Sequence, residues 1–136
     1  MTIGVARGIL LSTFIISFLI GAGSIFQVFV KSKIYSDSMS SMLLKLLSIY
    51  SAPLAVIIGG IFAQRNTQIR SVHTIAFWSA FILSAIWNIL VVGRFLLFTL
   101  TADDTVGALT SYLNAVVPPS YFLVMGGLSY FFAKRK

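Results

Sequence analysis

The residues that could support chemistry inside this chain are a few polar side chains within otherwise apolar runs. They are Gln27, Asn88, Arg94 and Asn114. Arg94 lies in the stretch WNILVVGRFLLF (87–98), six residues after Asn88. A guanidinium within a bilayer is costly and usually marks a structural partner or an ion pathway. These four side chains are therefore the candidate intramembrane polar residues.

Catalytic chemistry is not expected from this set of residues. The chain has no cysteine and no glutamate, and its single histidine, His73, stands at the start of an apolar run. Zinc ligands are therefore missing, and a nucleophilic serine would lack a buried base. Arginine stays protonated, so it cannot replace the titratable group of a proton-coupled pump. We expect a protein that is not an enzyme and has no catalytic residue, metal or cofactor.

The composition indicates an all-α integral membrane protein. Hydrophobic residues make up 58% of the 136 residues and charged residues 10%, whereas soluble domains carry about 25% charged residues. Each apolar run is near the ~20 residues that cross a bilayer as a helix, the structure that satisfies backbone hydrogen bonds within lipid. One domain of four transmembrane helices is predicted, at residues 8–30, 46–63, 74–100 and 112–133.

The basic residues predict the orientation. The side with both termini and the second loop carries six of them, whereas the opposite side carries Lys31, Lys33 and Lys45 with all three aspartates. Positive charge favours the cytoplasmic side, so both termini are expected there, in a bacterial inner membrane. Because the charges flank apolar runs, the net charge of +7 indicates topology and no direct nucleic-acid partner. The six residues are Arg7, Arg65, Arg70, Lys134, Arg135 and Lys136.

The second and fourth segments share a pattern of proline followed by a glycine pair. The spacing from Asp37 to Pro53 equals that from Asp103 to Pro119. This suggests a two-fold repeat of helix pairs (first with second, third with fourth), as in some transporters. The prolines should kink the helices, and the glycine pairs should allow close helix contact. The predicted kink and close-packing residues are Pro53, Gly59, Gly60, Pro118, Pro119, Gly126 and Gly127.

Small residues at helical spacing predict packing faces on three helices, within the chain or in a homo-oligomer. The faces are Thr13, Ser17, Gly21 and Ser24; Ser48, Ala52, Ala55, Gly59 and Ala63; and Ala76, Ala80, Ser84 and Asn88.

Arg94 has three interpretations. It lies about 10 Å from the middle of its helix, so its head could reach the outer surface, toward Asp103 or Asp104. It could instead be buried against Gln27, Asn114 or carbonyls freed by the prolines of the fourth helix. In an oligomer, a ring of Arg94 side chains could line an anion-selective mouth. Asn88 is deeper, and a hydrogen bond between helices, worth about 1 kcal/mol, is expected for it.

The leading hypothesis for function is a homo-oligomeric anchor or sensor subunit in the lipid bilayer. It would dock a cytoplasmic protein partner, or anionic lipid, through Arg65, Arg70, Lys134, Arg135 and Lys136. The size and topology are also compatible with four-helix membrane subunits of bacterial phage-defence systems such as Kiwa, with which the chain shares no diagnostic residues, so a defence or signalling complex is one setting for such a subunit. The alternatives are an oligomeric channel or pore lined by Arg94 and Asn88, and a small carrier with its site between the kinked second and fourth helices.

Overall fold

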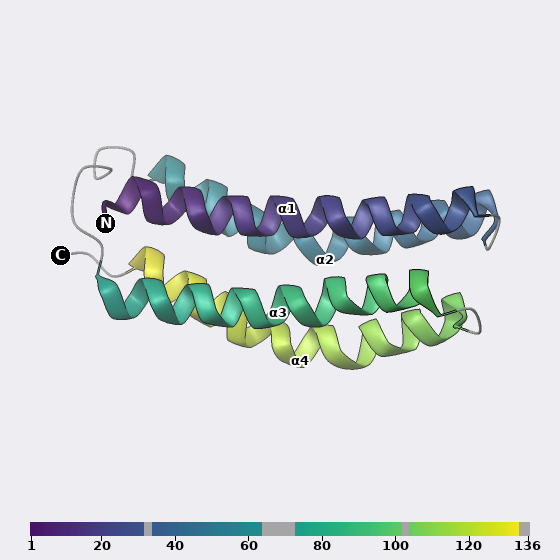
Figure 1. Ribbon diagram of the computed structural model, residues 1–136. Coiled ribbons are helices and arrows are strands. Elements are labelled where there is room, and N and C mark those ends of the chain that lie inside the picture. The colour runs from purple at the N-terminus through teal and green to yellow at the C-terminus, as the bar shows by residue number, and fades with distance from the viewer. Residues whose placement is uncertain (32–33, 64–72, 102–103, 134–136) are drawn as a thin grey trace.

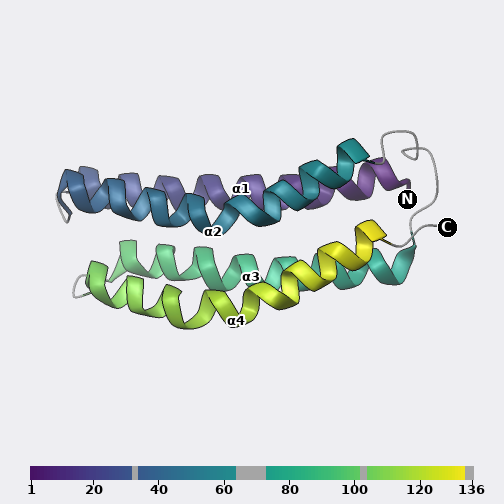
Figure 2. The ribbon, with the colours of Figure 1, turned by 180° about the vertical axis from the view of Figure 1, so that it is seen from behind.

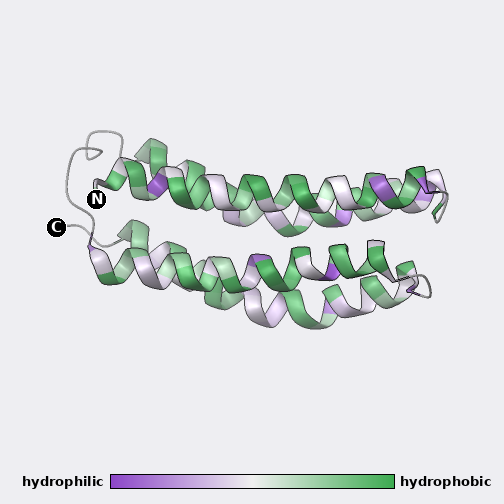
Figure 3. Cartoon of the chain, in the orientation of Figure 1, coloured by the Kyte–Doolittle hydropathy of each residue, from purple (hydrophilic) through white to green (hydrophobic). Residues whose placement is uncertain are grey.

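The computed structural model describes residues 1–31, 34–63, 73–101 and 104–133. These ranges form four helices, each long and apolar enough to cross a membrane, which confirms the all-α membrane fold. Apolar residues run along the length of all four (Figure 3). The helices are α1 (Ile3–Val30), α2 (Ser36–Ala63), α3 (Thr74–Leu100) and α4 (Val106–Ala133).

The helices form two hairpins that lie side by side (Figure 1). One hairpin is α1 with α2, the other is α3 with α4, and α1 packs along α3 between them. Among the described residues, α2 and α4 make the sparsest contact of the four neighbouring pairs. These contacts fit the predicted arrangement of two helix pairs. The start of α1 and the end of α4 lie at the same end of the bundle (Figure 1), which we call the inner end because the charge distribution predicts it in the cytoplasm.

Three of the four helices begin before the predicted membrane spans do. The α3 helix spans 74–100 as predicted, whereas α1, α2 and α4 begin earlier than 8, 46 and 112. Hydroxyl caps explain two of these extensions, because the Thr2 hydroxyl accepts a hydrogen bond from the Val5 N–H and the Thr105 hydroxyl accepts one from the Ala108 N–H. Such caps satisfy backbone donors that a helix start leaves free.

The early start of α2 places Lys45 within a helix. The buried residues of α2 include Met42, Leu46, Ile49 and Tyr50, a helical spacing that continues upstream of the predicted start. The 28 residues of α2 span about 42 Å, which exceeds the ~30 Å hydrocarbon core. The helix is thus longer than the predicted span, and Lys45 lies in it one residue before that span begins.

Three aromatic side chains from different helices meet near the middle of the bundle. Phe14 of α1, Tyr50 of α2 and Trp87 of α3 are all buried. The ring centroids of Tyr50 and Trp87 are 5.3 Å apart, and those of Phe14 and Trp87 are 5.9 Å apart. Tilted and edge-on aromatic contacts of this kind add to the stability from burial. This cluster joins the two hairpins at mid-depth.

The predicted small-residue faces have different outcomes. On α3 all four residues are buried, which confirms that face as a packing face, and on α1 the face is buried at Gly21 and Ser24. On α2 the face does not pack within the chain, because Ser48, Ala55 and Gly59 are exposed; its packing in a homo-oligomer stays a prediction. The large apolar residues of α2 occupy the buried side instead, so its small residues point away from the bundle.

The glycine pairs each contribute one close contact within the chain. A Cβ at Gly60 would overlap the ring of Phe132, and a Cβ at Gly127 would lie 3.3 Å from the Ala80 Cα. Gly59 and Gly126 face open space, so the prediction holds for only one member of each pair.

The three prolines lie inside α2 and α4. Both helices change direction near their middles, as Figure 2 shows. This agrees with the predicted kinks, because a proline within a helix removes a hydrogen bond and crowds the preceding turn.

Gly127→Leu should destabilise the protein, because the new side chain would meet the backbone of α3. Overpacking of this kind costs about 1–3 kcal/mol. The measurement is the thermal unfolding midpoint in mild detergent. Gly126→Leu is the matched control and should stay within about 0.5 kcal/mol of wild type. Equal destabilisation by both variants would contradict the packing described for these glycines.

Candidate functional site

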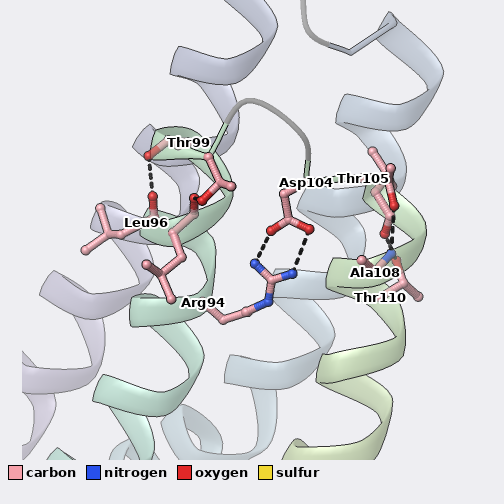
Figure 4. A network of polar contacts seen from close by, with 10 residues as sticks. Arg94, Leu96, Thr99, Asp104, Thr105, Ala108 and Thr110 are labelled. Carbon is pink, nitrogen blue, oxygen red and sulfur yellow. Dashed lines mark hydrogen bonds and ion pairs between the residues drawn. The ribbon is translucent and has the colours of Figure 1, made fainter.

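Arg94 forms a two-pronged ion pair with Asp104, at the point where the chain enters α4 (Figure 4). Its Nη2 atom donates to Asp104 Oδ1 at 2.8 Å, and Nη1 donates to Oδ2. The guanidinium carbon also lies 5.7 Å from the ring centroid of Tyr112. Arg94 thus reaches one of the two carboxylates predicted for it. Gln27 is exposed, and Asn114 has a different partner.

This ion pair connects the outer end of α3 to the segment that leads into α4. The two side chains are 15% and 11% exposed, so they are partly shielded from solvent. The hydrogen bonds from Arg94 lower the pKa of the Asp104 carboxyl, because they favour its charged form. Paired, bidentate geometry of this kind is stronger than a single charged contact.

Asn88 forms a hydrogen bond between helices at mid-depth, as predicted. The Tyr50 hydroxyl donates to Asn88 Oδ1 at 2.8 Å, and the Asn88 amide donates to the Ser84 carbonyl at 2.8 Å. Tyr50 was not predicted as its partner. Asn88 and Arg94 both bond within the chain, so this geometry gives no support to the hypothesis that they line a pore.

A cavity of about 300 Å³ lies between α2 and α4 in the outer half of the bundle. Its walls come from both helices, and Phe95 of α3 contributes from between them. We call this cavity the outer groove. It is lined by Ser41, Met42, Leu44, Lys45, Ser48, Phe95, Leu109, Thr110 and Leu113.

Lys45 is the charged residue of the outer groove. Its ammonium donates to Asn114 Oδ1 at 2.6 Å, which joins α2 to α4. Ser41, Lys45 and Ser48 lie four and three residues apart and share one face of α2, and Thr110 is the polar residue that α4 adds to the lining. Asn114 follows Thr110 by four residues on α4 and adjoins the outer groove through Lys45. The outer groove therefore carries a polar strip on α2 and polar groups of α4 beside it.

The predicted second span begins at residue 46, so Lys45 is not among the predicted intramembrane polar residues. The buried positions of α2 continue upstream to Met42 at helical spacing, and this apolar period is the signal that places Lys45 inside the helix. The serines of 36–41 interrupt the apolar pattern upstream of Met42.

The contact between α2 and α4 is tighter at the inner end. There the ring of Phe132 occupies the space beside Gly60. The guanidinium carbon of Arg7 lies 5.7 Å from the centroid of the same ring, and Arg7 is 2% exposed. Arg7 is thus packed into the bundle in addition to its predicted contribution to topology. The α2–α4 interface is open in its outer half and filled at its inner end.

The predicted docking residues Arg65, Arg70, Lys134, Arg135 and Lys136 lie outside the described residues. Docking of a cytoplasmic partner therefore stays a prediction.

No protein-family model, curated protein or solved structure matches this chain. Its function must be argued from the geometry of its own residues.

Acidification should weaken the Arg94–Asp104 pair. The pKa of Asp104 is lower in the folded state, so the pair contributes fully above the unfolded value of about 3.9. That contribution is lost as the pH falls through the folded pKa. At neutral pH, Asp104→Asn should cost about 1 kcal/mol, the upper end for such pairs. It should also reduce the loss of thermal stability between neutral and acid pH.

The measurement is the unfolding midpoint in detergent from pH 7 to pH 3. Asp37→Asn, at an exposed aspartate in the first turn of α2, is the matched control and should retain the wild-type pH dependence. An unchanged acid dependence in Asp104→Asn would show that this pair does not contribute to stability.

Proposed function

We propose that this protein is a small membrane carrier for an amphiphilic ligand, which enters the outer groove from the surrounding lipid. The observation that supports it best is the asymmetry of the α2–α4 interface. Its outer half encloses a polar-lined cavity, and its inner end is filled by Phe132 against Gly60. A carrier that is open toward one side of the membrane has this form.

The size and lining of the outer groove fit an amphiphile. A volume of about 300 Å³ is at the lower end of the ~300–1,000 Å³ range of ligand pockets. It can hold a headgroup or part of one chain, but not a whole two-chain lipid. Buried Met42, Leu109 and Leu113 offer apolar contact, while Lys45 and Thr110 offer polar groups. Both parts of an amphiphile therefore find complementary side chains.

The prolines make α2 and α4 easier to bend near their middles. Pro53 lies between the outer groove and Gly60, and Pro118 and Pro119 lie between the outer groove and Phe132. A helix that lacks hydrogen bonds at such a point bends more easily. The more extensive contacts of α1 with α2 and α3, and of α3 with α4, supply a frame for this movement. Binding at the interface of two repeats, beside broken helices, is the arrangement of several transporter folds.

Filling the outer groove should slow transport. Thr110→Trp places an indole at an exposed position of its wall, so it should block entry without disturbing the buried core. The measurement is leaflet exchange of a fluorescent single-chain phospholipid in proteoliposomes, followed by quenching from outside. Exchange should fall at least about fivefold relative to wild type, a change of about 1 kcal/mol in the barrier.

Ser111→Trp is the matched control, because Ser111 is exposed on the same helix and does not line the outer groove. It should exchange lipid at the wild-type rate. Wild-type exchange no faster than in protein-free liposomes, or equal rates for the two tryptophan variants, would overturn the carrier proposal.

A further inference from the structure

Lys45 carries a charge that no carboxylate balances among the described residues. The one ion pair in these ranges is Arg94–Asp104, so the Asp104 carboxylate already has a cationic partner. Asp37 is eight residues from Lys45 on α2, about 12 Å of helix rise. The hydrogen-bond partner of Lys45 is the neutral amide of Asn114. An ammonium that is partly buried in a cavity beside a neutral partner is stabilised by an anion, so the outer groove favours one.

From this we infer that the outer groove binds the anionic headgroup of a single-chain lipid from the outer leaflet, with Lys45 as its counter-charge. This inference rests on the proposed carrier function, for which it names the class of ligand. It assigns the headgroup to the polar strip of the outer groove and the first part of the acyl chain to the apolar wall.

The hydrogen-bonding groups around Lys45 suit an oxyanion. A lysine ammonium has three donors, and Asn114 accepts from one of them. The Asn114 amide nitrogen adds two donors beside the same ammonium. The hydroxyls of Ser48 and Thr110 bond to carbonyls of their own helices, so they neither neutralise Lys45 nor require an external partner. A phosphate or carboxylate oxygen beside Lys45 would therefore meet donors from both helices.

Volume and lining favour a lipid with one chain. Lys45 lies in the outer half of the bundle, and the cavity of about 300 Å³ that it lines must hold both the headgroup and the first part of its chain. A freely diffusing anion would gain no apolar contact from Met42, Leu109 and Leu113, which line the same cavity.

Binding to the purified full-length protein in nanodiscs tests the ligand class. Oleoyl-lysophosphatidylglycerol is the anionic probe, and monooleoylglycerol is the uncharged probe with the same chain. Wild type should bind the anionic probe at least about tenfold more tightly, a difference of about 1.4 kcal/mol. Lys45→Gln should remove this preference, and Lys45→Arg should retain it.

Lys31→Gln is the matched control for the loss of one positive charge, because Lys31 is exposed at the outer end of α1. It should keep the wild-type preference. Equal affinity of wild type for the two probes, or a preference that survives Lys45→Gln, would overturn the inference. Inorganic phosphate tests whether a free anion binds the same site. If phosphate displaced the anionic probe when both were at the same concentration, the assignment to lipid would be overturned.

The outcomes for ligand class and for transport can be told apart. Lys45-dependent binding of the anionic probe without leaflet exchange would uphold the headgroup site and reject the carrier. Exchange of both probes at the same rate, unchanged in Lys45→Gln, would uphold the carrier and reject the headgroup site. Circular dichroism and gel filtration confirm that each variant is folded before either result is used.

Discussion

The absence of water in a bilayer core is the constraint on which this structure depends. A polar side chain there must find a partner, on its own helix or on another, or lose the free energy of its hydration. Three such contacts connect the helices: Tyr50 with Asn88 between α2 and α3, Arg94 with Asp104 at the α3–α4 hairpin, and Lys45 with Asn114 between α2 and α4. Close packing alone would fix the helices less specifically, because lipid tails are as apolar as the side chains they would replace.

The three contacts differ in the net charge that remains after the two side chains have paired. Tyr50 and Asn88 are both neutral and buried, so their bond needs nothing further. Arg94 and Asp104 cancel one another. Lys45 alone of these residues keeps a net charge beside a neutral partner, and it does so in a cavity. The same requirement that stabilises the bundle at two places thus singles out the third as the place where a ligand would be bound.

Much of the fold could be predicted from the sequence, and the site could not. The apolar runs were sufficient for the four spans and for the ends of α3. The predicted second span begins at Leu46, directly after Lys45, so it leaves out that lysine and the first turns of α2. Which member of a glycine pair touches a neighbour depends on the rotation of each helix, as Gly60 and Gly59 illustrate. The pairing of Lys45 with Asn114 depends on which helices are adjacent, which one-dimensional periodicity does not specify.

The ion pair of Arg94 and Asp104 has a consequence for how the protein is made. Its two residues are ten apart in the sequence and belong to a single hairpin. They can therefore meet as soon as α3 and α4 emerge from the ribosome, before the other hairpin is in contact. An Arg at the centre of a helix raises the cost of membrane insertion by about 2.5–3.5 kcal/mol on insertion scales, and an Arg nearer the helix end raises it less. Neutralised within its own hairpin, Arg94 would enter the bilayer as part of an overall uncharged pair, so insertion of α3 and α4 would not depend on a charged partner from α1 or α2.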